Sequence, residues 1–169
     1  LPDGDLLANK GMAFVVADGI STSRRGREAA ETAVASFLTD YYATPDAWSP
    51  RTSAQRVIAA INSWMHGQNA ALGGMGAGYA DSDRAREAEG LVTTFTALIL
   101  RDAAAHILHL GDGVAARVNE AGLERLTEAH RVPAGGGAHL LARALGMGRH
   151  VEIDHSCIMV QPGDILLMA

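Results

Sequence analysis

The chain carries near its start the run Met12-Ala13-Phe14-Val15-Val16-Ala17-Asp18-Gly19. Six consecutive apolar residues predict a short strand that is buried on both faces, and the acid and glycine after them predict a turn. An aspartate at the end of such a strand is held in a fixed position. Asp18 is therefore the first candidate for a functional side chain.

Two helices are expected after this strand. Apolar residues recur at the spacing of an amphipathic helix from Gly26 to Tyr42. A second helix is expected to begin at the capping box Thr52-Ser53-Ala54-Gln55 and to run to about Ala71. The glycine-rich and polar residues 73–90 break this pattern and favour a loop.

The rest of the chain has the pattern of strands joined by hairpins, with one further helix expected at 139–145. Strands are expected at residues 92–100, 105–110, 114–118, 151–160 and from 165 onward. Hairpin-connected strands, with helices in separate places, indicate an α+β fold with antiparallel sheets rather than a doubly wound parallel sheet.

Composition excludes several classes of function. The 169 residues include 14 Lys and Arg against 19 Asp and Glu, and a net charge of −5 disfavours a nucleic-acid partner. No apolar run approaches the roughly 18 residues of a membrane span, so we expect no membrane contact. The single cysteine, Cys157, excludes an internal disulfide and a zinc site built from cysteines. These features predict one soluble domain in the cytoplasm.

Two acidic residues beside glycines are candidate metal ligands. The Asp18 carboxylate and the Gly19 carbonyl are oxygen donors of the kind that Mg²⁺ and Mn²⁺ prefer. Asp112 stands between Gly111 and Gly113 where a strand is interrupted. Two structural interpretations stay open, in which Asp18 accepts backbone bonds in a turn and Asp112 marks a β-bulge. Two carboxylates alone also make an incomplete cage for two metals.

Other motifs carry less chemistry. Residues 21–26 look like a phosphate-binding loop but lack its Gly-Lys-Ser/Thr ending, so Ser21 or Ser23 is expected to be a helix N-cap. His106 and His109 lie three apart on an expected strand, where their side chains point to opposite faces and cannot share a metal. A Gly-x-Ser-x-Gly elbow for a nucleophilic serine is absent from the sequence.

Seven segments, in order along nearly the whole chain, resemble motifs of the protein phosphatase 2C family. They are residues 14–19, 26–30, 93–98, 109–113, 126–130, 141–146 and 161–167. The fourth resembles the family's Gly-Asp-Ser-Arg motif and the fifth its Leu-Thr-x-Asp-His motif. The expected helix pair is most similar to bacterial members in which the phosphatase precedes a Ser/Thr kinase in one polypeptide.

The resemblance implies a sandwich of two antiparallel β-sheets flanked by helices, in four αββα layers, with two or three Mn²⁺ or Mg²⁺ ions at one end. By this resemblance Asp18 bridges two metals, the Gly19 carbonyl binds one of them, and Asp112 lies near a third. A water between the metals attacks the phosphorus of phosphoserine or phosphothreonine in line, so no covalent enzyme intermediate is needed.

The chain also departs from the family pattern. Ile20 stands where some members carry a histidine proposed as general acid, and Ala129 replaces the aspartate of the fifth motif. The family's first acidic motif and phosphate-binding arginine should precede Leu1, and further Asp ligands should follow Ala169. We therefore expect residues 1–169 to form a single phosphatase 2C-like domain, truncated at both ends, that cannot complete the two-metal cage alone.

Three functions are consistent with these residues. The first is a metal-dependent Ser/Thr phosphatase whose substrate is a phosphorylated protein and whose polypeptide also carries a kinase domain. The alternative is a catalytically inactive regulatory or binding module on the same fold, in keeping with the altered motifs. The third is an unrelated α+β interaction domain, which requires the ordered motifs to be coincidence.

Overall fold

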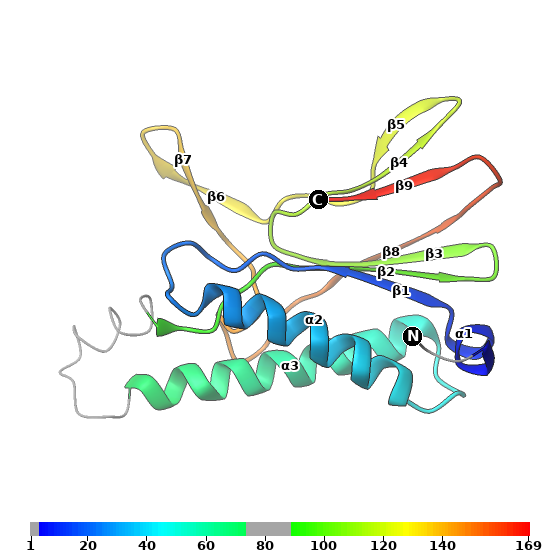
Figure 1. Cartoon of the computed structure of the whole chain (residues 1–169). Helices are drawn as coiled ribbons and strands as arrows, with labels where there is room; N and C mark the ends of the chain where they lie inside the picture. The colour runs from blue at the N-terminus through cyan, green and yellow to red at the C-terminus, as the bar shows by residue number, and fades with distance from the viewer. Residues whose placement is uncertain (1–3, 74–88) are drawn as a thin grey trace.

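The computed structural model describes residues 4–73 and 89–169 (Figure 1). Its helices are α1 (Gly4–Lys10), α2 (Gly26–Ala43) and α3 (Pro50–Gly73). Its strands are β1 (Met12–Val16), β2 (Phe95–Arg101), β3 (Ala104–Leu110), β4 (Ala115–Asn119), β5 (Gly122–Arg125), β6 (Arg131–Gly135), β7 (Ala138–Leu141), β8 (Asp154–Met159) and β9 (Ile165–Met168). None of the described helices is long and apolar enough to cross a membrane. Most of the loop expected at 73–90 lies outside the described residues.

The elements form three layers. One sheet has the strand order β1-β2-β3-β8 and a second the order β5-β4-β9, and all their pairings are antiparallel. Figure 1 shows α2 and α3 on one face of the first sheet, the second sheet on its other face, and the β6–β7 hairpin projecting from the body. The α+β fold and the antiparallel sandwich are thus confirmed, and the described residues make up three of the four expected layers.

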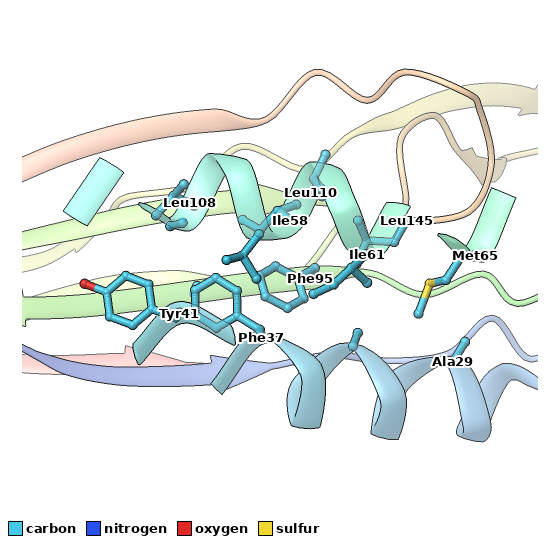
Figure 2. Close-up of a cluster of buried hydrophobic side chains, with 14 of the residues drawn as sticks. Ala29, Phe37, Tyr41, Ile58, Ile61, Met65, Phe95, Leu108, Leu110 and Leu145 are labelled. Carbon is cyan, nitrogen blue, oxygen red and sulfur yellow. The ribbon is translucent and has the colours of Figure 1, made fainter. Parts of the chain in front are cut away.

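The main core lies between the helices and the first sheet (Figure 2). Residues at intervals of four in α2 are fully buried: Ala29, Ala33, Phe37 and Tyr41. The Phe37 ring packs edge-on against Phe95 of β2, with centroids 5.2 Å apart. The α3 side chains Ile58, Ile61 and Met65 close the cluster from the neighbouring helix. The predicted amphipathic faces are those that the structure buries.

A smaller core fills the space between the two sheets. Leu98 of β2, Ala105 and Ile107 of β3, and Ala115 of β4 are buried there. Residues of β2 therefore alternate between two cores, Phe95, Ala97 and Ile99 toward the helices and Leu98 toward the second sheet. This explains why the β2 sequence is apolar almost throughout.

The prediction that the first strand is buried on both faces is wrong for the described residues. β1 is an edge strand, and its side chains Met12, Phe14 and Val16 are 48%, 43% and 37% exposed. Ala13 and Val15 pack against the helical core. The second sheet does not cover the outer face of β1, and a cavity of about 670 Å³ lined by residues of β1, β2 and β9 lies there instead.

Two local predictions fail at turns. The second helix begins at Pro50 rather than at a capping box, because the Ser49 hydroxyl accepts a 3.1 Å bond from the Thr52 amide and proline suits the first helical position. The helix expected at 139–145 is wrong, since β7 pairs there with β6. Gly135, Gly136 and Gly137 all have positive φ, and this turn folds the short segment back into a hairpin.

Two buried asparagines fasten α3 to the loops beyond the sheet. The Asn69 side chain accepts a 2.7 Å bond from the Leu91 amide and donates bonds of 3.0 Å to the carbonyls of Leu91 and Gly146. Asn62, two turns earlier, accepts from the Gly146 amide at 2.9 Å and donates to the Gly148 carbonyl at 2.9 Å. These side chains satisfy backbone groups that have no strand partner, as buried polar groups require.

We predict that Asn69→Ala lowers the free energy of unfolding by about 2–4 kcal/mol, because three buried backbone groups lose their partner. Urea unfolding followed by circular dichroism measures the change. Gln68→Ala, at an exposed position of the same helix, is the matched control and should change stability by less than about 0.5 kcal/mol. Equal effects of the two substitutions would show that the Asn69 bonds contribute nothing.

Candidate functional site

Asp18 and Asp112 lie at the same end of the first sheet, where β1 and β3 end and β2 begins. The chain that enters β2 runs between them. The Thr94 amide donates a 2.9 Å bond to the Asp18 carbonyl, and the Asp18 amide donates to the Thr94 hydroxyl at 3.0 Å. Gly111 packs on the other side of Thr94, where an added Cβ would lie 2.6 Å from the Thr94 side chain. Two strand spacings, about 10 Å, therefore separate the backbones that carry the two acids.

The Asp18 carboxylate extends from this fixed backbone into solvent. Asp18 is exposed, and its carboxylate has no hydrogen bond or ion pair within residues 4–73 and 89–169. The alternative interpretation, in which the Asp18 side chain accepts backbone bonds in a turn, is not supported. The bonds of Asp18 are made by its backbone amide and carbonyl. A carboxylate with both oxygens free is available to a ligand.

Gly19 is required by packing. A Cβ at Gly19 would lie 1.9 Å from the Gly26 carbonyl oxygen, and one at Gly26 would lie 2.5 Å from the Ile20 carbonyl oxygen. The two glycines thus allow the loop to close tightly onto the start of α2. The Gly19 carbonyl takes no part in the bonds that join this segment to Val92 and Thr94, which run through the Ile20 amide and the Asp18 carbonyl.

Asp112 is bound within the protein. The Arg131 side chain donates two bonds to Asp112 Oδ2, from Nη2 at 2.7 Å and from Nε at 2.9 Å. The ion pair therefore occupies Oδ2 of Asp112, the second candidate metal ligand, with two hydrogen bonds. A β-bulge at Asp112 was the alternative prediction; the residue lies instead in the turn between β3 and β4, where Gly111 has a φ of 109°.

The expected serine N-caps are wrong. Ser23 is buried, and its hydroxyl donates a 2.7 Å bond to the Gly90 carbonyl and accepts a 3.1 Å bond from the Arg25 amide. The N-cap of α2 is Arg25, which makes no side-chain capping bond. Ser23 therefore ties the loop after Asp18 to the segment that leads into β2.

Two buried histidines, His109 and His130, bind the backbone of the Gly111–Gly113 turn. Sequence reasoning missed this pair. His109 Nε2 faces the carbonyls of Gly111 and Glu128 at 3.1 Å each, so it must carry the proton. Nδ1 of the same ring then accepts from the Thr96 hydroxyl at 2.9 Å. Segment 126–130, which resembles a family motif, contains part of this network, but no spacing in the sequence connects it to His109.

His130 completes the support. Its Nδ1 accepts a 3.1 Å bond from the Gly111 amide, so Nε2 carries the proton and donates to Asp154 Oδ2 at 3.0 Å. Asp154 also accepts from Arg143 at 3.0 Å. The network fixes the turn that carries Asp112 through bonds to the two imidazole rings. The separation of His106 from His109 on opposite faces is as expected, since His106 contacts His155 instead.

Burial and the hydrogen bonds shift the ionisation of this network. Burial is the main cause that lowers the pKa of His109, and the neighbouring His130 lowers it further. The hydrogen bond from His130 is the main cause that lowers the pKa of Asp154. A neutral His109 and an ionised Asp154 are therefore the stable forms near neutral pH.

The described residues supply only part of a metal site. Asp18 and the Gly19 carbonyl are oxygen donors that suit a hard divalent cation, while Asp112 is already paired with Arg131. Within the part of the chain that the structure describes, no group of three or more His, Cys, Asp or Glu residues is placed to hold a metal ion. A divalent cation thus fits at Asp18, but with few protein ligands.

Comparison with known families and structures gives a consistent result. A model of the family described as Protein phosphatase 2C matches residues 5–143. None of the curated proteins matches the chain. The fold is similar to that of PppA of Pseudomonas aeruginosa, described as a key regulatory component of T6SS, with a TM-score of 0.71 and 21% identity over 92% of this chain.

Two further structures are similar over most of the chain. One is the PPM Ser-Thr phosphatase MsPP of Mycobacterium smegmatis in complex with cacodylate, with a TM-score of 0.70 and 25% identity over 94% of this chain and 67% of that one. The other is the catalytic domain of the phosphatase PstP in complex with 2 manganese ions, with a TM-score of 0.70 and 21% identity over 92% of this chain. The chain spans 63% of the length of PppA and 65% of that of PstP.

We predict that Gly19→Ala destabilises the metal-free protein by about 3 kcal/mol, because the new methyl group meets the Gly26 backbone. Urea unfolding in the presence of EDTA measures this. Gly67→Ala is the control, since a Cβ there meets nothing within 4 Å and alanine favours a helix by up to about 1 kcal/mol. A Gly19→Ala protein as stable as the wild type would mean that the close approach of Gly19 and Gly26 is not a packing requirement.

We also predict that stability falls as the pH is lowered below about 6.5. Because the pKa of His109 is lowered in the folded state, the unfolded chain binds its proton at a higher pH and gains stability relative to the fold. The free energy of unfolding should fall by up to about 1.4 kcal/mol per pH unit for this group. Urea unfolding between pH 5.5 and 7.5 at constant ionic strength measures the slope.

His109→Gln should reduce that slope, whereas His139→Gln, at an exposed position of β7, should leave it unchanged. Burial also lowers the pKa values of His106 and His155, so part of the slope remains in the His109 variant. A slope unchanged by His109→Gln would contradict the assignment.

Proposed function

The chain belongs to the protein phosphatase 2C family, and on that premise we propose that it hydrolyses phosphoserine and phosphothreonine in proteins with the help of Mn²⁺ or Mg²⁺. The observation that carries the proposal is the Asp18 carboxylate, which has no partner within residues 4–73 and 89–169 and projects from a backbone fixed by two bonds to Thr94. The catalytic domain of PstP, which has a similar fold, binds manganese.

Asp18 is the residue we assign to the cation. Two or three ions are proposed for the site; the Asp18 carboxylate would hold them, with the Gly19 carbonyl oxygen and the Asp112 carboxylate as further oxygen donors. A bound divalent cation supplies Lewis acidity, which neutralises phosphate oxygens and makes water a stronger nucleophile. The bonds from Thr94 hold the Asp18 backbone in place before any ligand arrives, so little ordering is needed on binding.

The residue two positions after Asp18 bears on how the leaving group receives a proton. Hydrolysis forms a bond from water oxygen to phosphorus and breaks the bond from phosphorus to the serine or threonine oxygen. Ile20 has no ionisable group, so this position supplies no proton to the departing oxygen. His109 and His130 are buried and use their Nε2 protons in bonds within the protein, so they support the site rather than exchange protons with substrate.

A catalytically inactive binding or regulatory module is the second candidate. Two observations favour it: Asp112 is paired with Arg131, and the described residues contain no cluster of three metal-binding side chains. The chain also spans less than two thirds of PppA, so the activity of such longer relatives is a proposal for this protein. A Ser/Thr kinase domain in the same polypeptide remains a prediction of the resemblance.

We predict that, in a polypeptide that carries the whole phosphatase domain, Asp18→Asn lowers kcat/KM for a phosphothreonine peptide in Mn²⁺ by at least about a hundredfold, because the amide is neutral and a weaker cation ligand. Phosphate release from the peptide measures the rate. The variant should fold as stably as the wild type, because Asp18 is exposed and its side chain has no partner among the described residues. Asp40→Asn, also exposed and of the same change in charge, is the control.

Full activity of Asp18→Asn would refute the assignment of Asp18. No hydrolysis by the wild type, despite measurable binding of a phosphothreonine peptide, would favour the binding module. Manganese removal by EDTA should abolish hydrolysis, and its return should restore it.

A further inference from the structure

An arginine with unused hydrogen-bond donors lies at the end of the sandwich that carries Asp18. We propose that Arg131 binds the phosphate group of the substrate through these donors. The inference rests on the proposed function, because it takes a phosphorylated protein as the ligand of this site. It applies equally to a binding module that holds the phosphate without hydrolysing it.

The Arg131 guanidinium is fixed along one edge and open along another. Nε and Nη2 donate to Asp112 Oδ2, at 2.9 and 2.7 Å. These bonds leave unused most of the N–H donors that an arginine carries. Nη1 makes no hydrogen bond within residues 4–73 and 89–169, and the Arg131 side chain is 51% exposed. The edge formed by Nη1 and Nη2 is therefore available, and its planar geometry matches the oxygens of a phosphate group.

The backbone that carries Arg131 is held from both ends of its hairpin. The His130 amide, one residue earlier, donates to the Gly111 carbonyl at 2.7 Å. After β7, the Ala142 amide donates to the His130 carbonyl at 2.7 Å, and Arg143 forms ion pairs of 3.2 and 3.0 Å with acids near the start of β8. The guanidinium is thus oriented before a ligand arrives, which reduces the entropy lost when a phosphate binds.

Arg131 and Asp18 lie at the same end of the sandwich. Figure 1 shows the β6–β7 hairpin and the loop between β1 and α2 at that end. Two strand spacings, about 10 Å, separate the Asp18 backbone from the turn that carries Asp112, the partner of Arg131. A cation–oxygen bond spans about 2.1 Å and an N–H···O bond about 2.8 Å, so a cation on Asp18 and a phosphate group fit between the two side chains. One phosphate group can therefore contact both.

Other arginines at this end of the sandwich suit the phosphate less. Arg143 gives Nη1 and Nη2 to different carboxylates, so its charge is already compensated. Arg24 is 83% exposed and makes a 3.2 Å bond to Glu89 through Nη1, which does not hold its guanidinium in one orientation. Arg131 combines a fixed orientation with unused donors, and a binding site requires both.

The test measures the affinity of a fluorescently labelled phosphothreonine peptide, and of the same peptide without phosphate, by fluorescence anisotropy. It uses a polypeptide that carries the whole phosphatase domain, in EDTA so that no hydrolysis occurs. We expect Arg131→Gln to bind the phosphorylated peptide about five- to tenfold more weakly than the wild type, because charge-assisted bonds to the phosphate are lost. Its affinity for the unphosphorylated peptide should not change.

Two further variants separate a local contact from a general loss of charge. Arg51→Gln removes the same charge from an exposed residue in the first turn of α3, at the opposite end of the sandwich (Figure 1), and should match the wild type. Arg131→Lys keeps the charge but lacks the planar fork, so its affinity should lie between those of Arg131→Gln and the wild type. The Arg131 variants should remain folded, because an exposed ion pair contributes little to stability.

An Arg131→Gln protein that binds the phosphorylated peptide as tightly as the wild type would overturn the proposal. So would an equal loss for both peptides, or a wild type that does not prefer the phosphorylated one. Hydrolysis is measured separately, in Mn²⁺. Weaker phosphopeptide binding by Arg131→Gln, with no hydrolysis by the wild type, supports the role of Arg131 and refutes the phosphatase. Hydrolysis by the wild type, with binding unchanged in Arg131→Gln, does the reverse.

Discussion

The structure depends on the burial of β2 on both of its faces. This strand pairs with β1 on one side and β3 on the other, and its side chains pack alternately against the two helices and the second sheet. A strand in that position must be apolar at most positions, with any buried polar side chain hydrogen-bonded, and must satisfy its backbone on both edges. The segment that enters it, Thr93 and Thr94, then bonds to Leu145 and to Asp18. The candidate site is therefore positioned by the same pairing that forms the core.

Buried polar side chains hold the loops around β2 in place. Asn62 and Asn69 bond the loops beyond the sheet to α3, and the His109–His130 pair holds the turn that carries Asp112. Each ring or amide has donors matched to acceptors, which offsets the cost of taking these groups out of water. The end of the sheet that carries Asp18 thus differs from the interior of the protein: Asp18 has no side-chain partner within residues 4–73 and 89–169, while the buried polar groups next to it are paired. A binding site requires side chains that have no partner in the protein and are held by a rigid backbone.

The sequence predicted most of the fold because its signals are local. The apolar face of α2, the apolar run of β2 and the turn between β8 and β9 each follow from residues that are neighbours in the chain. The errors arose where a signal was short or ambiguous. Residues 139–145 have a helical composition, but the glycine turn before them and the pairing with β6 decide for a strand. At the start of α3, Ser49 with Pro50 is a stronger beginning than the capping box two residues later.

The sequence by itself determined the α+β class, the strand that ends at Asp18 and the presence of an acid at Asp112, because a periodic pattern and a motif are properties of consecutive residues. Only the tertiary structure decided that β1 is an edge strand, that Gly19 is needed for contact with Gly26, and that Asp112 is held by Arg131. These features depend on residues 7, 19 or 80 to 88 positions apart in the chain. Their contact is a consequence of how sheets and helices stack, and no local pattern encodes which distant side chain will reach a given carboxylate.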